Sequence, residues 1–271
     1  MSRIAETFRR LKERNEAAFM PYVACGDPSA EFTVELANTL IQNGADLLEF
    51  GIPFSDPIAD GPTIQNASVR ALRAGMHPDI AFEVARKIRN QNAQIPIVVM
   101  TYYNLVMHGG VEKFVSKMKE IGLDGLIVPD LPIEESADLE KLVHEIGVDL
   151  VHLVSPRSSD ARIKEITSRS SGFVYLVSVE GTTGAREKVE NRALNLIKRV
   201  KEISREQIPL AMGFGISRPE HVKSIVGAGA DGVIVASKII DLYSKDPTNP
   251  KMHLAEIAEF ANAMKAACKK Q

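Results

Sequence analysis

The chain alternates between short apolar runs and longer segments in which apolar residues recur every three or four positions. Eight of the short runs are rich in Val, Ile and Leu and are continuous, which is typical of strands covered on both faces of a parallel sheet. The predicted strands are Phe19–Ala24, Leu47–Glu49, Ile97–Met100, Gly125–Val128, Leu150–Val154, Phe173–Val177, Leu210–Met212 and Gly232–Val235. The pattern therefore predicts an α/β protein.

Helix signals lie between these strands. Ser29 is a favourable N-cap, apolar residues follow it at helical spacing, and Gly44 stands where the same helix would end. Further helices are predicted over Thr63–Ala74, Asp79–Asn90, Glu134–Ile146 and Pro219–Val226.

Eight strand–helix units predict a closed (β/α)8 barrel (TIM barrel) with additional short helices, occupying residues 1–271 as a single domain. The first residues, MSRIAETFRRLKERNEA, have an amphipathic helix pattern, and we expect this extra helix to close the bottom of the barrel. An open doubly wound sheet is the alternative. Such a sheet usually carries a glycine-rich fingerprint after its first strand, and CGDPSAEF is not one.

Composition removes several function classes. The chain of 271 residues has a formal net charge of −2 and no long basic run, which argues against nucleic acid as a partner. Its six histidines are scattered without HExxH spacing, so no metal site is expected. The two cysteines, Cys25 and Cys268, fit the reducing cytoplasm, and no apolar run is long enough to span a membrane.

The segment EFGIPFSDPIADGP, from Glu49 to Pro62, combines acidic residues with prolines and glycines directly after a predicted strand. In a barrel, loops that follow the strands meet at one face, so Glu49 and Asp60 are candidates for acid–base chemistry. The apolar neighbours of Glu49 should raise its pKa. The alternative is that Glu49 pairs with a buried cation while Asp56 and Asp60 cap turns.

Residues of the last three strand ends add binding candidates. Tyr175, in the sixth strand, is placed to orient a substrate, although a tyrosine there can also simply fill the core. The segments 212–217 and 235–238 follow the seventh and eighth strands, where barrels often bind phosphate. The glycine- and threonine-containing segment 180–186 is a candidate lid.

The stretch EFGIPFSDPIADGPTIQ, with MPYVACGDP before it and YLVSVEGTTGAR after it, closely resembles the tryptophan synthase α-subunit family over essentially the whole chain. The resemblance implies retro-aldol cleavage of indole-3-glycerol phosphate to indole and glyceraldehyde 3-phosphate, without a metal or organic cofactor. It implies that Glu49 shuttles protons, that Asp60 binds the indole N–H and stabilises positive charge, and that Tyr175 positions the substrate.

The resemblance also implies a set of binding residues. The phosphate positions are Gly184, Phe214, Gly215, Ala236 and Ser237, with Thr183 in the lid loop. The indole pocket positions are Tyr22, Met100, Ile127 and Ile234. Ala236 replaces a glycine that is usual in the family, and its N–H can still serve a phosphate if its φ is negative.

The family works as an α2β2 complex in which the beta subunit binds pyridoxal phosphate. The resemblance places five residues near that interface: Pro53, Asp56, Asn104, Asp130 and Pro132. Three alternatives stay open: a stand-alone lyase that releases indole, a catalytically weak barrel that serves as an allosteric partner of the beta subunit, and another phosphate-binding barrel such as a sugar-phosphate isomerase.

Overall fold

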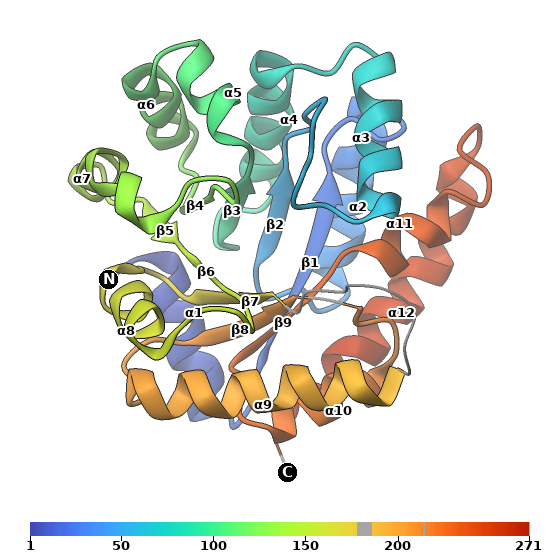
Figure 1. The fold of residues 1–271 in the computed structure, drawn as a ribbon. Helices are drawn as coiled ribbons and strands as arrows, with labels where there is room; N and C mark the ends of the chain where they lie inside the picture. Colours follow the sequence, from blue (N-terminus) through green and yellow to red (C-terminus); the bar gives the residue numbers. More distant parts are fainter. Residues whose placement is uncertain (178–185, 214, 271) are drawn as a thin grey trace.

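The strands form a parallel barrel (Figure 1). The computed structural model describes residues 1–177, 186–213 and 215–270. Its strands are β1 (Ala18–Ala24), β2 (Leu48–Gly51), β3 (Ile97–Met100), β4 (Gly125–Ile127), β5 (Asp149–Val151), β6 (Leu153–Val154), β7 (Val174–Val177), β8 (Leu210–Gly213) and β9 (Gly232–Val235). They pair in the order β5-β4-β3-β2-β1-β9-β8-β7-β6.

The two ends of this order belong to one strand. Only His152 separates β5 from β6, so the sheet closes on itself at this residue. The first half of the strand pairs with β4 and the second half with β7. The predicted eight-unit barrel is therefore confirmed, with its fifth strand, expected over Leu150–Val154, interrupted at one position.

Helices surround the strands (Figure 1). They are α1 (Arg3–Glu13), α2 (Ala30–Gln42), α3 (Pro62–Arg73), α4 (Pro78–Gln91), α5 (Tyr103–His108), α6 (Val111–Ile121), α7 (Ala137–Glu145), α8 (Asp160–Arg169), α9 (Arg186–Ser204), α10 (Pro219–Gly227), α11 (Ser237–Tyr243) and α12 (Leu254–Ala266), with short 3-10 helices η1 (Ile133–Glu135) and η2 (Pro250–His253). Ser29 caps α2 as predicted, because its hydroxyl accepts a hydrogen bond from the Phe32 N–H.

Helix α1 closes the N-terminal end of the barrel. Ile4, Phe8 and Leu11 are buried in one cluster with the side chains that fill the barrel interior. The rings of Phe8 and Phe173 lie 6.0 Å apart between centroids, which joins the helix to the strand side of this cluster. Burial of its apolar stripe explains why an otherwise charged segment packs here, and the expected plug is confirmed.

Two predicted boundaries differ from the structure. Strand β2 continues to Gly51, which pairs with Met100, so Glu49 lies inside the strand rather than at its end. The helix expected over Glu134–Ile146 divides into η1 and α7 at Ser136. The Ser136 hydroxyl lies within hydrogen-bond distance of the Ile133 carbonyl and the Glu140 carboxylate, a local arrangement that competes with a continuous helix.

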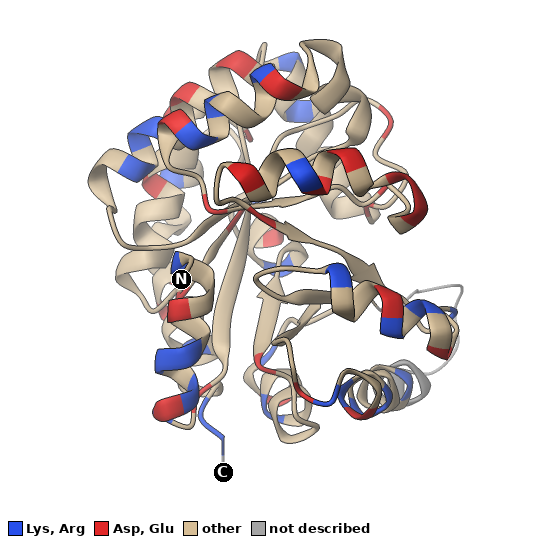
Figure 2. Cartoon of the chain, turned by 90° about the vertical axis from the view of Figure 1, so that its left-hand side faces the viewer, with Lys and Arg blue, Asp and Glu red and all other residues tan. Residues whose placement is uncertain are grey.

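The outer surface mixes charges of both signs. Figure 2 shows basic and acidic residues interspersed along the helices of the viewed face, which agrees with the small net charge. Within the described residues, no helix is both long and apolar enough to cross a membrane.

Candidate active site

Glu49 is a buried carboxyl group, and no cation among the described residues pairs with it. It is 2% exposed, and its Oε2 atom has no hydrogen-bond partner among the described residues. Burial, and then the nearby Asp60 carboxylate, raise the pKa of Glu49 to about 8. The described residues therefore give no support to the alternative in which Glu49 pairs with a buried cation, and a pKa of about 8 favours the protonated form at neutral pH.

Asp60 comes from the loop between β2 and α3. Burial raises its pKa to about 6, against the opposing effect of a hydrogen bond from Tyr102. Asp60 does not cap α3, because Gly61 occupies the N-cap position. Asp56, in the same loop, is exposed and accepts a hydrogen bond from Ser55, so the two aspartates have different surroundings.

Tyr102 is a site residue that the sequence interpretation missed. Its hydroxyl donates a 3.0 Å hydrogen bond to Asp60 Oδ2 and accepts one of 3.0 Å from the Ala59 N–H. Its ring stacks on Phe54, with 5.2 Å between centroids. Tyr102 lies two residues after the end of β3. Its position in the segment that follows a strand was the one signal in the sequence that could have identified it as a site residue.

Tyr22 and Tyr175 lie on the barrel wall, and each hydroxyl rests against a glycine of the next strand. A Cβ atom on Gly51 would lie 2.0 Å from the Tyr22 hydroxyl, and one on Gly213 would lie 2.3 Å from that of Tyr175. The pKa of each tyrosine is raised well above 10, first by burial and then by Glu49 and Asp60. Both predicted tyrosines therefore share one site with the two carboxyl groups.

The remaining indole-pocket candidates lie on the same inner wall. Ile127 and Ile234 are nearly fully buried in the interior cluster, and Met100 packs against it. Met100 is the strand partner of both Gly51 and Ile127. The structure thus brings Met100, Ile127 and Ile234 to the barrel interior, and it pairs Tyr22 with Glu49 on neighbouring strands.

The predicted phosphate positions fall at the ends of β8 and β9. Gly215 is exposed and has a φ of 61°, a conformation that favours glycine. Ala236 precedes α11 with a φ of −118°, so alanine is unstrained there and the condition on its negative φ is met. Ser237 is exposed at the start of α11. Thr183, Gly184 and Phe214 lie outside the described residues.

Four of the five predicted interface residues are exposed at the mouth of the barrel. They are Asp56, Asn104, Asp130 and Pro132, whereas Pro53 is buried beneath them. Two large apolar side chains, Ile58 and Met107, are 81% and 56% exposed on the same loop and on α5. The surface next to the site therefore presents apolar groups to solvent.

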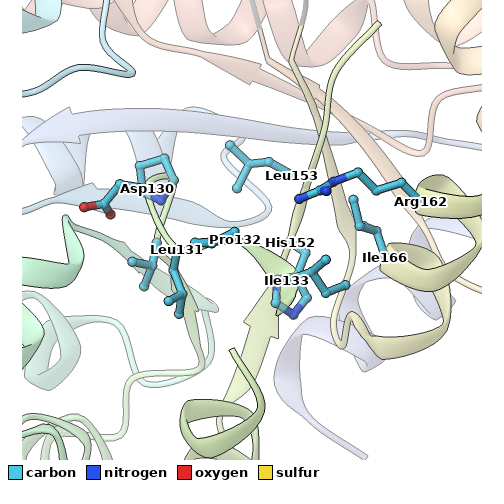
Figure 3. Close-up of a pocket in the computed structure, with 10 residues that line it drawn as sticks. Asp130, Leu131, Pro132, Ile133, His152, Leu153, Arg162 and Ile166 are labelled. Atoms are coloured by element: carbon cyan, nitrogen blue, oxygen red, sulfur yellow. The ribbon is translucent and has the colours of Figure 1, made fainter. Parts of the chain in front are cut away.

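A separate cavity of about 360 Å³ lies between the ends of β4 and β6 and helix α8. His152 and Arg162 face it, while the Asp130 carboxylate points away from them (Figure 3). His152 is 3.0 Å from Glu140, and Arg162 forms two hydrogen bonds with Glu134. Neither Glu49 nor Asp60 nor a tyrosine lines this cavity, and His152 and Arg162 have partners of their own.

The described residues contain no group of three His, Cys, Asp or Glu side chains arranged to hold a metal ion. What the site offers instead is a protonated carboxyl group, an ionised carboxylate and tyrosine hydroxyls beside an apolar interior. Two carboxyl groups whose pKa values are separated in this way can act as a proton donor and as a stabiliser of positive charge.

Comparisons with known proteins agree with this geometry. The family model described as tryptophan synthase alpha chain matches residues 8–269. The tryptophan synthase alpha chain of Methanocaldococcus jannaschii is 50% identical over 90% of this chain and 85% of the relative. That of Methanothermobacter thermautotrophicus is 45% identical over 97% of this chain and 95% of the relative.

Solved structures give the same result. The tryptophan synthase alpha chain of Legionella pneumophila superposes with a TM-score of 0.87 at 32% identity, covering 99% of this chain and 97% of that one. A chain from the tryptophan synthase α2β2 complex of Pyrococcus furiosus superposes with a TM-score of 0.85 at 37% identity, covering 92% and 98%. This chain belongs to the tryptophan synthase alpha chain family.

Proposed function

We propose that this chain cleaves indole-3-glycerol phosphate to indole and glyceraldehyde 3-phosphate by retro-aldol chemistry, as the alpha subunit of tryptophan synthase. The observation that carries the proposal is the separation of the two carboxyl groups. With pKa values of about 8 and about 6, Glu49 is protonated and Asp60 is ionised near pH 7. The identity of the substrate is inferred from membership of the tryptophan synthase alpha chain family.

In the proposed reaction, Glu49 first gives its proton to C3 of the indole ring. The ring then carries a positive charge, which the ionised Asp60 stabilises while it accepts a hydrogen bond from the indole N–H. Glu49, now ionised, takes the proton of the neighbouring glycerol hydroxyl. The O–H electrons form the aldehyde, the carbon–carbon bond breaks, and its electrons neutralise the ring. The proton lost by the hydroxyl balances the one gained at C3.

Three groups of residues bind the substrate in this proposal. The indole ring packs against Tyr22, Met100, Ile127 and Ile234, and Tyr175 orients the glycerol chain. The phosphate contacts the ends of β8 and β9 at Gly215, Ala236 and Ser237, together with Gly184 and Phe214. Thr183 belongs to a lid over the site. The negative φ of Ala236 supports this assignment because its N–H stays available without strain.

We infer that the enzyme acts without a metal or organic cofactor, because each step needs only a proton transfer or the stabilisation of charge. Pyridoxal phosphate belongs to the partner in this proposal. The buried, free thiols of Cys25 and Cys268 support a cytoplasmic location, where cysteines stay reduced.

The proposed partner is the beta subunit of tryptophan synthase, in an α2β2 complex. The exposed apolar groups Ile58 and Met107 lie among the exposed interface candidates Asp56, Asn104, Asp130 and Pro132, which supports a contact at the barrel mouth. Pro53, which is buried, would act by holding this loop rather than by direct contact.

Indole release tests the proposed function. The purified chain is incubated with indole-3-glycerol phosphate, with and without a beta subunit of the family. We expect indole in both cases and a faster rate in the complex. Full turnover without any partner would favour a stand-alone lyase. Absence of indole under both conditions would reject the reaction.

A further inference from the structure

Asp27 is a buried carboxylate that the proposed reaction does not use. Its side chain is fully buried and belongs to the loop between β1 and α2. The Arg70 guanidinium donates a hydrogen bond of 2.7 Å to each of its two oxygens, and the Tyr243 hydroxyl donates another of 2.7 Å to Oδ2. Burying a carboxylate is costly unless it is paired and hydrogen-bonded, so these contacts hold the three residues together.

The loop that carries Asp27 is itself held in place. The Asp27 N–H donates to the Ala24 carbonyl at 3.2 Å, and the Gly26 N–H donates to the Thr33 hydroxyl at 2.9 Å. Ala24 is the last residue of β1, and Thr33 is buried on α2. Asp27 is therefore a fixed point at the end of β1, and its two partners reach it from other elements.

Those partners belong to the two helices that border the proposed site. Arg70 lies in α3, which begins two residues after Asp60, and Tyr243 is the last residue of α11, which begins at Ser237. The two helices pack against each other and against β1 (Figure 1). Arg70 also donates a 2.9 Å hydrogen bond to the hydroxyl of Ser244, the C-cap residue of α11. Two hydrogen bonds thus join the end of α11 to the Asp27–Arg70 pair.

The placement of α11 depends on these hydrogen bonds because the helix is short. It has seven residues, which span about 10 Å, so a tilt at its C-terminal end also moves its first residue. Burial of Ile239, Ile240 and Leu242 holds α11 against its neighbours, but apolar burial has no direction. Hydrogen bonds are directional, so those at Tyr243 and Ser244 fix where the helix ends relative to α3.

We propose that Tyr243 and Ser244 are positioning residues, which set the phosphate-binding end of α11 against α3 through the Asp27–Arg70 pair. This role rests on the proposed function, in which the substrate phosphate contacts Ser237 at the start of α11. The indole ring, by contrast, packs against residues of the strands. Loss of the two hydrogen bonds should therefore weaken the hold on the phosphate and leave the hold on the ring unchanged.

Substitutions that remove single hydroxyls test this role. Tyr243→Phe keeps the ring, which packs edge-on against Phe32 at 5.2 Å between centroids, and leaves the Asp27–Arg70 pair intact. NMR titrations measure the binding of glycerol 3-phosphate and of indole separately. We expect the Kd for glycerol 3-phosphate to rise about five-fold and that for indole to change less than about two-fold, because a small displacement of a binding group is costly only to the ligand it contacts. Ser244→Ala should act in the same direction.

Each variant has a matched control. Tyr103→Phe also removes a tyrosine hydroxyl, but from α5, which follows β3 rather than β9. Ser168→Ala removes the hydroxyl of an exposed serine that donates to the Glu165 carbonyl within α8. Neither control should change the Kd of either ligand.

Binding measured without turnover separates this role from the proposed function. Equal affinities of Tyr243→Phe and the parent for glycerol 3-phosphate would overturn the role even if the chain releases indole. An equal loss for both ligands would also overturn it, because it would show a general loosening of the barrel. A selective loss in a chain that releases no indole would support the role while rejecting the reaction. A parent chain that does not bind glycerol 3-phosphate would reject the phosphate site and this role with it.

Steady-state kinetics gives a second readout. In Tyr243→Phe the KM for indole-3-glycerol phosphate should rise about five-fold while kcat stays within about two-fold of the parent, because the carboxyl groups that move the protons are untouched. A fall in kcat at an unchanged KM would contradict the positioning of the phosphate.

Discussion

The hydroxyl of Tyr102 holds Asp60 Oδ2 at 3.0 Å while it accepts an equally long hydrogen bond from the backbone N–H of Ala59. One side chain thus fixes both the carboxylate and the loop that carries it. These two hydrogen bonds of Tyr102 explain why Asp60, although it belongs to a loop, has a defined position at the barrel mouth. The hydrogen bond that Tyr102 donates to Asp60 also holds the pKa of Asp60 below the value that burial alone would give.

Tyr102→Phe should weaken catalysis by removing these two hydrogen bonds. Because a hydrogen bond to a charged group contributes about 1.5–3 kcal/mol, we expect kcat/KM for indole release to fall at least about ten-fold at pH 6. The acid side of the pH profile should move to higher pH, since the pKa of Asp60 rises without its donor. An unchanged profile would mean that Tyr102 has no part in holding Asp60.

Glu49→Gln and Asp60→Asn should each lower indole formation by at least about 10²-fold, the usual size of an acid–base contribution. Both substitutions keep the shape of the side chain and remove its charge. Glu83→Gln is the control, since this exposed glutamate on α4 lies on the outside of the barrel. A parental rate in either of the first two variants would refute the assignment of that residue.

The pH profile of kcat/KM should be bell-shaped, with limbs near pH 6 and pH 8. Below the lower limb Asp60 becomes protonated and loses its charge, and above the upper limb Glu49 has already lost the proton it must donate. In Asp60→Asn the residual activity should lose the acid limb. Its alkaline limb should move to lower pH, because the charge of Asp60 contributes to the raised pKa of Glu49. A single limb in the parent enzyme would contradict the two-carboxyl scheme.

Glu49 should lower the stability of the folded chain at alkaline pH. The folded chain keeps its proton up to about pH 8, whereas the unfolded chain releases it near the ordinary value of 4.5, so the free energy of unfolding falls as pH rises between these values. Glu49→Gln removes this titration. The free energy of unfolding of the variant minus that of the parent should therefore be larger at pH 8 than at pH 4.5, by about 4 kcal/mol. Urea unfolding at the two pH values measures it. An equal difference at both would show that Glu49 titrates normally.

Met107→Glu should weaken binding of the beta subunit without changing the activity of the isolated chain. The substitution removes the apolar surface that Met107 would bury in the contact, and the new carboxylate has to be desolvated. We therefore expect the Kd for the beta subunit to rise at least about ten-fold. Met252→Glu is the matched control, because this methionine is 62% exposed, close to the 56% of Met107, but lies on η2. Calorimetric titration measures both. Equal effects of the two substitutions would place the interface elsewhere.

Much of the fold was predictable because a strand covered on both faces must be apolar throughout. The eight apolar runs correspond to the observed strands, and the charged first segment is the helix that closes the barrel. The boundaries were less certain. Ser136 divides an expected helix through its own hydrogen bonds, and the fifth strand changes its pairing at His152. Neither event has a signal in apolar periodicity, because each depends on contacts formed after the chain has folded.

The sequence by itself determined the barrel, the loop that carries the acids, and the identity of Glu49, Asp60 and Tyr175 as candidates. Only the tertiary structure decided which carboxyl group is protonated, because a pKa depends on burial and on neighbours that lie far apart in the chain. Tyr102 lies 42 residues from Asp60 and still fixes it. Tyr22 reaches its place only because Gly51 on the next strand has no side chain. Such relationships arise when parallel strands bring distant residues to one end of a barrel.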